Sequence, residues 1–270
     1  MTDAGTIPQT AGLLPTAADL DRLFDAKYRR PTGWVGAQPA RRKRYGYFTP
    51  DDVYEATVEK LLPAGGRWLD VGGGRDVFPS NPQLAEELAA RAGRMVAVDP
   101  SPNVYENPVA HDKYECLIED FRSAEPFDLL TLRMVAEHIT DPPRAVAALA
   151  RLTAPGGRVV VYTVSKFSPV SLAAWAMPFR LHNPVKKLVW QTEQRDTFPV
   201  AYKMNTRRAL GGLFDTHGLQ EVAFAKLDDA RTFGQFRGPN HVELGAVAVC
   251  RAVGVAYPEH CLLGVYEKSG

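Results

Sequence analysis

The chain has 270 residues, enough for one large α/β domain with additions. Its 32 Lys and Arg residues balance 31 Asp and Glu residues, and a net charge of +1 gives no overall field that would favour nucleic acid as a partner. Three cysteines without a CxxC pair argue against a disulfide framework and against a cysteine-rich zinc site, and they fit the reducing cytoplasm, the location we expect.

The first residues predict a flexible tail. Residues 1–16 are rich in Thr, Gly, Ala and Pro, and they lack the basic segment and long apolar run of a secretory signal. No stretch of about 18 uninterrupted apolar residues occurs, so no integral membrane segment is expected. We expect a single domain over residues 17–270.

Two helices are predicted before the first strand of the sheet. Residues 17–28 carry apolar side chains at helical spacing. The second helix follows Thr49, a suitable N-cap, with Pro50 at its first position and a stop at Pro63. These helices form the predicted N-terminal cap, residues 17–64.

From residue 67 short apolar strands alternate with helices. This rhythm predicts a parallel sheet covered on both faces, within a cofactor-binding core over residues 65–165. The expected strands cover 67–71, 94–99, 114–120, 127–132 and 158–164, and the intervening helices include 83–93 and 142–153.

Residues 166–205 break the rhythm with an aromatic, proline-punctuated segment after the fifth strand. An insertion there would cover the carboxyl edge of the sheet, so we predict a lid over an apolar or ring-bearing acceptor. Residues 166–190 also have the basic and apolar mix of an interfacial helix, which leaves peripheral membrane contact open. Core packing and a dimer contact are the plainer alternatives, and no pattern predicts the oligomeric state.

The last part, residues 206–270, is expected to complete the sheet. A helix over 205–218, capped by Asn205, precedes strands at 221–229 and 241–253, the second antiparallel because its side chains partly alternate. The predicted fold is α/β: a doubly wound, Rossmann-like, seven-stranded and mostly parallel sheet with an antiparallel last strand, N-terminal helices and a lid insertion.

The stretch RWLDVGGGRD ends a strand with Asp70 and follows it with Gly72, Gly73 and Gly74. Glycines here let a ligand approach bare backbone. A dinucleotide fold needs GxGxxG, and Val77 occupies the third glycine position. A sulfonium nucleoside suits the loop better, because an acid before the glycines can accept from the amino group of a methionine moiety.

The motif D-V-G-G-G resembles the first motif, E/D-x-G-x-G, of class I S-adenosylmethionine-dependent methyltransferases, and the order of later elements resembles that family through residues 67–165. The resemblance implies that Asp99, followed by Pro100, accepts from the ribose hydroxyls. It also implies that Asp120 accepts from the adenine amine and that Phe121 flanks the ring.

Each assignment has a structural alternative. Asp70 could cap the next helix, and Asp99 with Pro100 could form an ordinary turn. A shift in register could exchange Asp120 for Glu119 or for Asp112, a more distant acid. Arg75 and Asp76 could form only a surface pair.

The segment after the fourth strand supplies candidate groups for chemistry. Histidine is the usual side chain for proton transfer near neutral pH, so His138 could act as a general base, or it packs beneath the cofactor and holds the loop. Arg133 could orient the cofactor's carboxylate or pair with Glu137. Tyr47 could bond the methionine carboxylate, or it packs on the core.

Candidate acceptor contacts are Trp175, Tyr202 and Asn205, and the scattered histidines predict no metal site. The predicted function is transfer of a methyl group from S-adenosyl-L-methionine to a small organic acceptor, at oxygen or nitrogen, in secondary metabolism or glycoconjugate modification. The alternatives are an NAD(P)-dependent oxidoreductase of Rossmann type and a non-catalytic scaffold that keeps the cofactor site.

Overall fold

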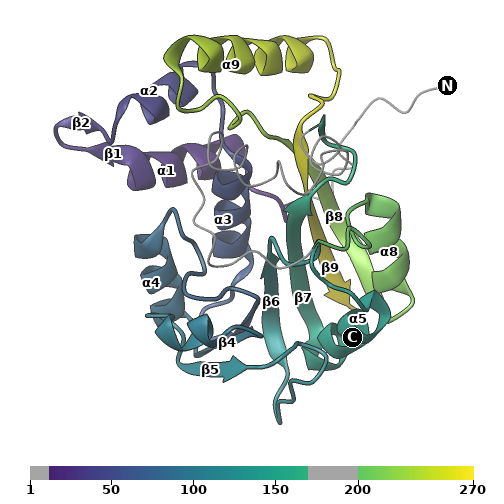
Figure 1. Cartoon of the computed structure of the whole chain (residues 1–270). Helices are drawn as coiled ribbons and strands as arrows, with labels where there is room; N and C mark the ends of the chain where they lie inside the picture. Colours follow the sequence, from purple (N-terminus) through teal and green to yellow (C-terminus); the bar gives the residue numbers. More distant parts are fainter. Residues whose placement is uncertain (1–11, 170–199) are drawn as a thin grey trace.

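A computed structural model describes residues 12–169 and 200–270, and a seven-stranded sheet forms its centre (Figure 1). The strand order is β5-β4-β3-β6-β7-β9-β8, and β9 runs antiparallel to both of its neighbours. The strands are β3 Arg67–Val71, β4 Arg94–Asp99, β5 Asp112–Glu115, β6 Phe127–Arg133, β7 Thr153–Val164, β8 Leu219–Asp228 and β9 His260–Lys268. The predicted doubly wound sheet with an antiparallel last strand is confirmed, and the strand order reverses direction at β3.

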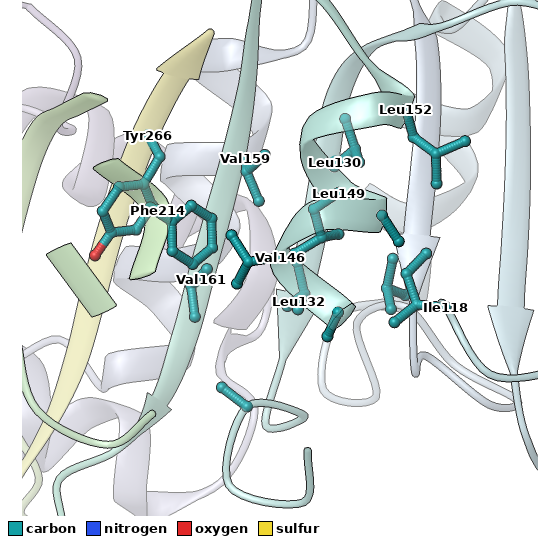
Figure 2. Close-up of a cluster of buried hydrophobic side chains, with 14 of the residues drawn as sticks. Ile118, Leu130, Leu132, Val146, Leu149, Leu152, Val159, Val161, Phe214 and Tyr266 are labelled. Carbon is teal, nitrogen blue, oxygen red and sulfur yellow. The ribbon is translucent and has the colours of Figure 1, made fainter. Parts of the chain in front are cut away.

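Helices cover both faces of this sheet. One buried cluster joins the sheet to α5 and α8, and its Leu149, Val161 and Phe214 are among the side chains drawn in Figure 2. A second cluster joins the other face to α1, α3 and α4. The helices are α1 Ala17–Tyr28, α2 Ala37–Arg44, α3 Pro50–Leu61, α4 Pro82–Arg91, η1 Pro102–Glu106, α5 Pro142–Leu152, α8 Arg207–Asp215 and α9 Arg237–Ala252, and a small hairpin pairs β1 Arg29–Arg30 with β2 Gly33–Trp34.

Local signals explain where the first helices begin. Thr49 accepts a hydrogen bond from the backbone N–H of Asp52, whose carboxylate accepts in return from the Thr49 N–H, and Pro50 takes the first helical position. The same reciprocal cap begins α1 at Thr16. Both predicted N-terminal helices are therefore confirmed.

The predicted strand at 241–253 is wrong, because these residues belong to α9. The side chains that α9 buries are Asn240, Glu243, Leu244 and Val247, which have helical spacing. Leu244 and Val247 pack against Tyr47. The antiparallel strand that completes the sheet is β9, later in the chain.

Two smaller boundaries also differ from the prediction. The strand expected at 114–120 begins earlier and ends at Glu115, so residues 118–120 form a turn. The helix expected from Asn205 is capped by Thr206, whose hydroxyl accepts from Ala209 N–H.

The described residues cover only part of the predicted tail and lid. Leu13 and Leu14 pack against the core, and Lys60 donates to the Leu14 carbonyl, so the packed chain begins before α1. Residues 170–199 lie outside the described residues, and with them most of the predicted lid and interfacial helix. Within the described ranges, no helix combines the length and apolar character needed to cross a bilayer.

A buried ionic cluster fastens α1 to α3. Lys27 lies 3.0 Å from the Asp52 carboxylate and 2.8 Å from that of Glu55, and Arg42 lies 2.8 Å from Asp52. Burial would lower the pKa of Lys27, but the two carboxylates raise it above its usual range. Such a cluster is costly to break, because removing one partner leaves an opposite charge buried.

We expect Lys27→Met to lower the free energy of unfolding by about 3 to 5 kcal/mol, since Glu55 would lose its only cation in this cluster. Urea denaturation followed by circular dichroism measures the change. The matched control is Arg22→Ala, which removes an exposed ion pair between the same two helices, with Glu59, and should cost at most about 1 kcal/mol. Equal losses in the two variants would contradict this account.

Candidate functional site

A cavity of about 560 Å³ opens at the carboxyl ends of β3, β4 and β6. This edge lies beside the point where the strand order reverses, the usual place for ligands in such sheets. The predicted site residues that line it are Gly72, Gly73, Gly74, Asp99, Pro100, Arg133 and His138.

The glycine loop forms one wall of the cavity, and two of its positions require glycine. Gly72 has a φ of +73°, and a Cβ there would lie 2.3 Å from the Val135 side chain. At Gly73 a Cβ would lie 1.8 Å from Asp70 Oδ2. The loop can therefore lie this close to Val135 and Asp70 only because Gly72 and Gly73 have no side chains.

Asp70 lies beneath the loop and is almost completely buried, with 1% of its surface exposed. Thr131 donates to its Oδ1 at 2.7 Å, whereas Oδ2 has no hydrogen-bond partner in the part of the chain that is described. Burial raises the pKa of the Asp70 carboxyl to about 7; the Thr131 bond and Arg133 oppose this rise, and Asp99 adds to it. Asp70 does not cap α4, because Asn81 does.

Asp99 ties the end of β4 to the glycine loop. Its Oδ2 accepts from Gly74 N–H at 3.0 Å, and its Oδ1 accepts from Ser101 N–H at 2.7 Å. Asp99 also lines the cavity. It therefore forms the turn that the sequence analysis gave as the alternative, and it lies at the predicted site as well.

Asp120, the acid predicted to bind the adenine amine, does not lie at the cavity. Asp120 is exposed in a turn, 3.4 Å from Arg144, and does not line the cavity. Phe121 is buried in the core cluster. Glu119 does line the cavity, so the structure favours the register alternative, with Glu119 facing the site in place of Asp120.

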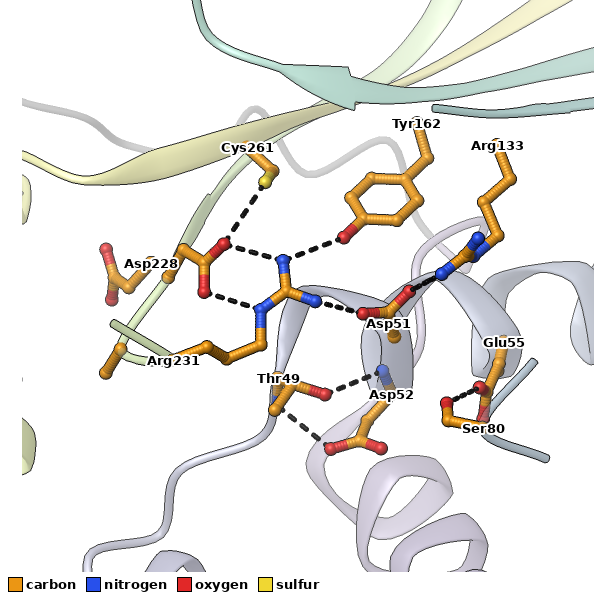
Figure 3. Close-up of polar contacts among 12 residues, drawn as sticks. Thr49, Asp51, Asp52, Glu55, Ser80, Arg133, Tyr162, Asp228, Arg231 and Cys261 are labelled. Atoms are coloured by element: carbon orange, nitrogen blue, oxygen red, sulfur yellow. Dashed lines mark hydrogen bonds and ion pairs between the residues drawn. The ribbon is translucent and has the colours of Figure 1, made fainter. Parts of the chain in front are cut away.

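Arg133 is held by an acid from α3 and not by Glu137. Its Nη2 and Nε lie 2.8 and 3.1 Å from Asp51 Oδ1, and Arg231 pairs with the other oxygen of Asp51 (Figure 3). Arg231 is held in turn by Asp229, at 2.6 Å. Burial would raise the pKa of Asp51, but the two guanidinium groups hold it below its usual range.

Three other expected contacts, all among the described residues, do not line the cavity. The Tyr47 hydroxyl donates to the Asp228 carbonyl and accepts from Ala230 N–H, and its ring packs under α9. Asn205 is fully buried and donates to Thr163 and to the Val164 carbonyl. Tyr202 donates its N–H to the Glu137 carbonyl at 3.2 Å, and Trp175 lies outside the described residues.

Glu137 forms the inner support of the segment that carries His138. Its carboxylate accepts from Thr163 at 2.7 Å, and its carbonyl accepts from Ala201 N–H at 2.7 Å. Burial raises the pKa of Glu137, and the Thr163 bond opposes this rise. The neighbouring His138 side chain is therefore placed at the cavity by a fixed turn.

Sequence reasoning missed the apolar wall of the cavity, formed by Leu117, Ile118, Met134, Val135 and Ile139. Met134 has a φ of +54°, which is unusual for a residue with a side chain. The apolar residues just after the fourth predicted strand were a signal for this wall. No sequence pattern predicts the left-handed backbone at Met134. In the described part of the chain, no group of three His, Cys, Asp or Glu side chains could hold a metal ion.

Comparison with known proteins adds a family to this geometry. A family model described as a methyltransferase domain matches residues 42–223, more than half of the chain. A ubiquinone biosynthesis O-methyltransferase from Neisseria meningitidis serogroup A is 37% identical over 114 residues, 38% of this chain and 45% of that protein. The match thus spans less than half the length of this curated relative.

Solved structures with the same fold include proteins of different activity. One is a chain from the complex of the Haloferax volcanii Trm112 methyltransferase activator and a putative methyltransferase, with a TM-score of 0.52, 14% identity, and coverage of 92% of this chain and 98% of that chain. Another is the [4+2]-cyclase SpnF, with a TM-score of 0.50, 18% identity, and coverage of 96% and 99%. Likeness at such low identity shows a shared fold alone.

We expect the stability of the protein to fall as pH rises from about 4 to about 7, because the native Asp70 carboxyl keeps its proton where the unfolded one has lost it. Asp70→Asn lacks this carboxyl. As pH rises from 4 to 8, the free energy of unfolding of the variant minus that of the wild type should therefore increase by about 2 to 4 kcal/mol. Urea denaturation at several pH values measures the difference. Asp76→Asn, an exposed acid of the same loop, is the control; a difference that is constant with pH in Asp70→Asn would contradict the assignment.

Proposed function

This chain belongs to the methyltransferase domain family, and from that premise we propose that it transfers the methyl group of S-adenosylmethionine to a small organic acceptor. The observation that carries the proposal is the cavity wall made by the glycine loop, with Asp70 beneath it and Asp99 beside it. The curated relatives are named O-methyltransferases, so we propose oxygen as the acceptor atom.

The residues present fit this cofactor. Asp70 Oδ2 is a buried acceptor with no partner among the described residues, and it lies where a Cβ on Gly73 would be. It suits the cationic amino group of the methionine moiety. Asp99 and Glu119 both line the cavity and can accept from the ribose hydroxyls and from the adenine amine, and Arg133 can orient a carboxylate.

When bound, the cofactor supplies an electrophilic methyl group on a sulfonium, so the chemical activation is its own. The chain has to align the acceptor with the methyl group and exclude water, which together contribute about 7 to 11 kcal/mol at most. The apolar wall of the cavity, which includes Leu117 and Ile139, suits the exclusion of water. His138 lines the same cavity, and we propose that it takes a proton from an acceptor hydroxyl.

The alternatives have less support. An oxidoreductase would need the third glycine of a dinucleotide loop, and Val77 is a buried core residue at that position. A scaffold without methyl transfer would keep the same fold and cavity, and activity assays separate it from an enzyme. A cytoplasmic location rests on cysteine usage alone and stays a prediction.

We expect S-adenosylhomocysteine to bind with a Kd of about 1 to 100 μM in isothermal titration calorimetry. Asp99→Ala should abolish this binding, because it removes an acceptor in the cavity and releases the glycine loop from β4. Asp112→Ala is the control: this acid, at the start of β5, pairs with Arg94 and does not line the cavity. If the wild type binds NADH and not S-adenosylhomocysteine, the proposal is wrong.

For His138→Asn we expect kcat to fall by about 10² to 10⁴ with an acceptor hydroxyl, while the Kd for S-adenosylhomocysteine changes less than about threefold. A panel of phenols, carboxylic acids and amines, assayed by S-adenosylhomocysteine release, identifies the acceptor class first. An unchanged kcat would exclude His138 as the base. A large loss of cofactor affinity would instead assign it a structural role.

A further inference from the structure

Three buried polar side chains form a hydrogen-bonded chain behind the glycine loop. Trp68 Nε1 donates to Thr131 Oγ1 at 2.8 Å, and Thr131 donates to Asp70 Oδ1 at 2.7 Å. Thr131 is the register partner of Asp70 on the adjacent strand, and Trp68 lies two residues before Asp70 on the same face of β3. Trp68 and Thr131 are completely buried, so water does not compete for these bonds.

The direction of this chain is fixed by chemistry. An indole N–H can only donate, so the Thr131 oxygen must accept from it. The single hydroxyl proton of Thr131 is then available for one strong bond. Its alternative acceptor, the Leu69 carbonyl, lies 3.5 Å away, whereas Asp70 Oδ1 lies at 2.7 Å. The proton therefore points to Asp70.

The second oxygen of Asp70 differs from the first. Oδ2 is buried and has no hydrogen-bond partner among the described residues, and it lies directly beneath Gly73. A buried acceptor without a donor is costly unless a ligand satisfies it. With Oδ1 occupied by Thr131, Oδ2 is the oxygen left for a ligand.

We propose that Trp68 and Thr131 are positioning residues that hold Asp70 Oδ1 in place and keep Oδ2 as the acceptor for the cationic amino group of the cofactor. This inference rests on the proposed function. It assigns a role to two residues that act only through Asp70. None of the three lines the cavity itself, and Asp70 Oδ2 lies against Gly73 of the loop that does.

The charges around Asp70 act in opposite directions on the ionisation of its carboxyl. Arg133 on β6 favours the ionised carboxylate, and Asp99 on β4 opposes it. The buried Tyr54 hydroxyl from α3 also interacts with Asp70, and burial together with this interaction raises the pKa of Tyr54. Because burial raises the pKa of Asp70 to about 7, protonated and ionised forms coexist there. The bond from Thr131 favours the ionised form, which alone attracts a cation strongly.

The test measures S-adenosylhomocysteine binding by calorimetry from about pH 5 to about pH 9, in the wild type and in three variants. We expect Thr131→Val to weaken binding about tenfold near pH 7 and to move the acidic limb of the profile up by about one pH unit. Trp68→Phe should shift both in the same direction by a smaller amount, since its Thr131 hydroxyl is free to turn. Thr131→Ser keeps the hydroxyl and should restore the wild-type profile.

A second readout needs no ligand. The titration of the Asp70 carboxyl, followed by carbon NMR in protein labelled at aspartate, should have its midpoint raised in Thr131→Val by the same amount as the binding profile. Thr153→Val is the matched control, because Thr153 is an equally buried threonine whose hydroxyl donates to the Leu149 carbonyl away from the cavity. It should change neither profile.

The outcomes separate this inference from the proposed function. If wild-type protein does not bind S-adenosylhomocysteine, the proposed function fails. A raised titration midpoint of Asp70 in Thr131→Val would still show that the Thr131 hydroxyl stabilises the Asp70 carboxylate. If the wild type binds and Thr131→Val loses affinity equally at every pH, the role is structural and the inference is wrong. If Thr131→Val does not fold, a wild-type profile in Trp68→Phe overturns the inference.

Discussion

The pairing of Asp51 with Arg133 and Arg231 joins three parts of the molecule that are distant in sequence. Arg133 ends a central strand at the cavity, Asp51 lies in the first turn of α3, and Arg231 lies in the segment that leads to α9. The Asp51 carboxylate therefore joins α3 and the segment before α9 to Arg133 at the carboxyl edge of the sheet (Figure 3). Removing one member of a buried ion-pair network leaves an opposite charge buried, so the position of Arg133 in the cavity wall depends on Asp51 and Arg231, which do not line the cavity.

The glycine loop shows how a site can depend on groups that stability alone would not select. Asp70 is buried, one of its oxygens has no hydrogen-bond partner among residues 12–169 and 200–270, and a glycine is needed above it. A core built only for stability would replace this acid with an apolar side chain. A buried acid at this position fits the cation recognition proposed above, and proteins accept such local costs at functional sites.

Much of the fold could be predicted because its signals are local. The strands at 67–71 and 94–99 are nearly continuous apolar runs, and Thr49 with Pro50 marks the start of α3. Asp70 and Asp99 lie at the ends of such strands, Asp70 beneath the glycine loop and Asp99 at the cavity, whereas the prediction for Asp120 assumed a strand that in fact ends five residues earlier, at Glu115. The α9 segment alternates enough to suggest a strand, and only packing against Tyr47 reveals its helical face. Long-range pairs such as Arg133 with Asp51, 82 residues apart, have no local signal at all.

The position of β9 has a consequence for how the chain assembles. β9 follows β8 in sequence but lies between β7 and β8, pairing with both. Until residues 260–268 have emerged from the ribosome, β8 has no neighbour to join and β7 exposes an open edge. This side of the sheet can therefore be completed only after residues 260–268 have been made, and a nascent chain halted before residue 260 would expose the unpaired edges of β7 and β8.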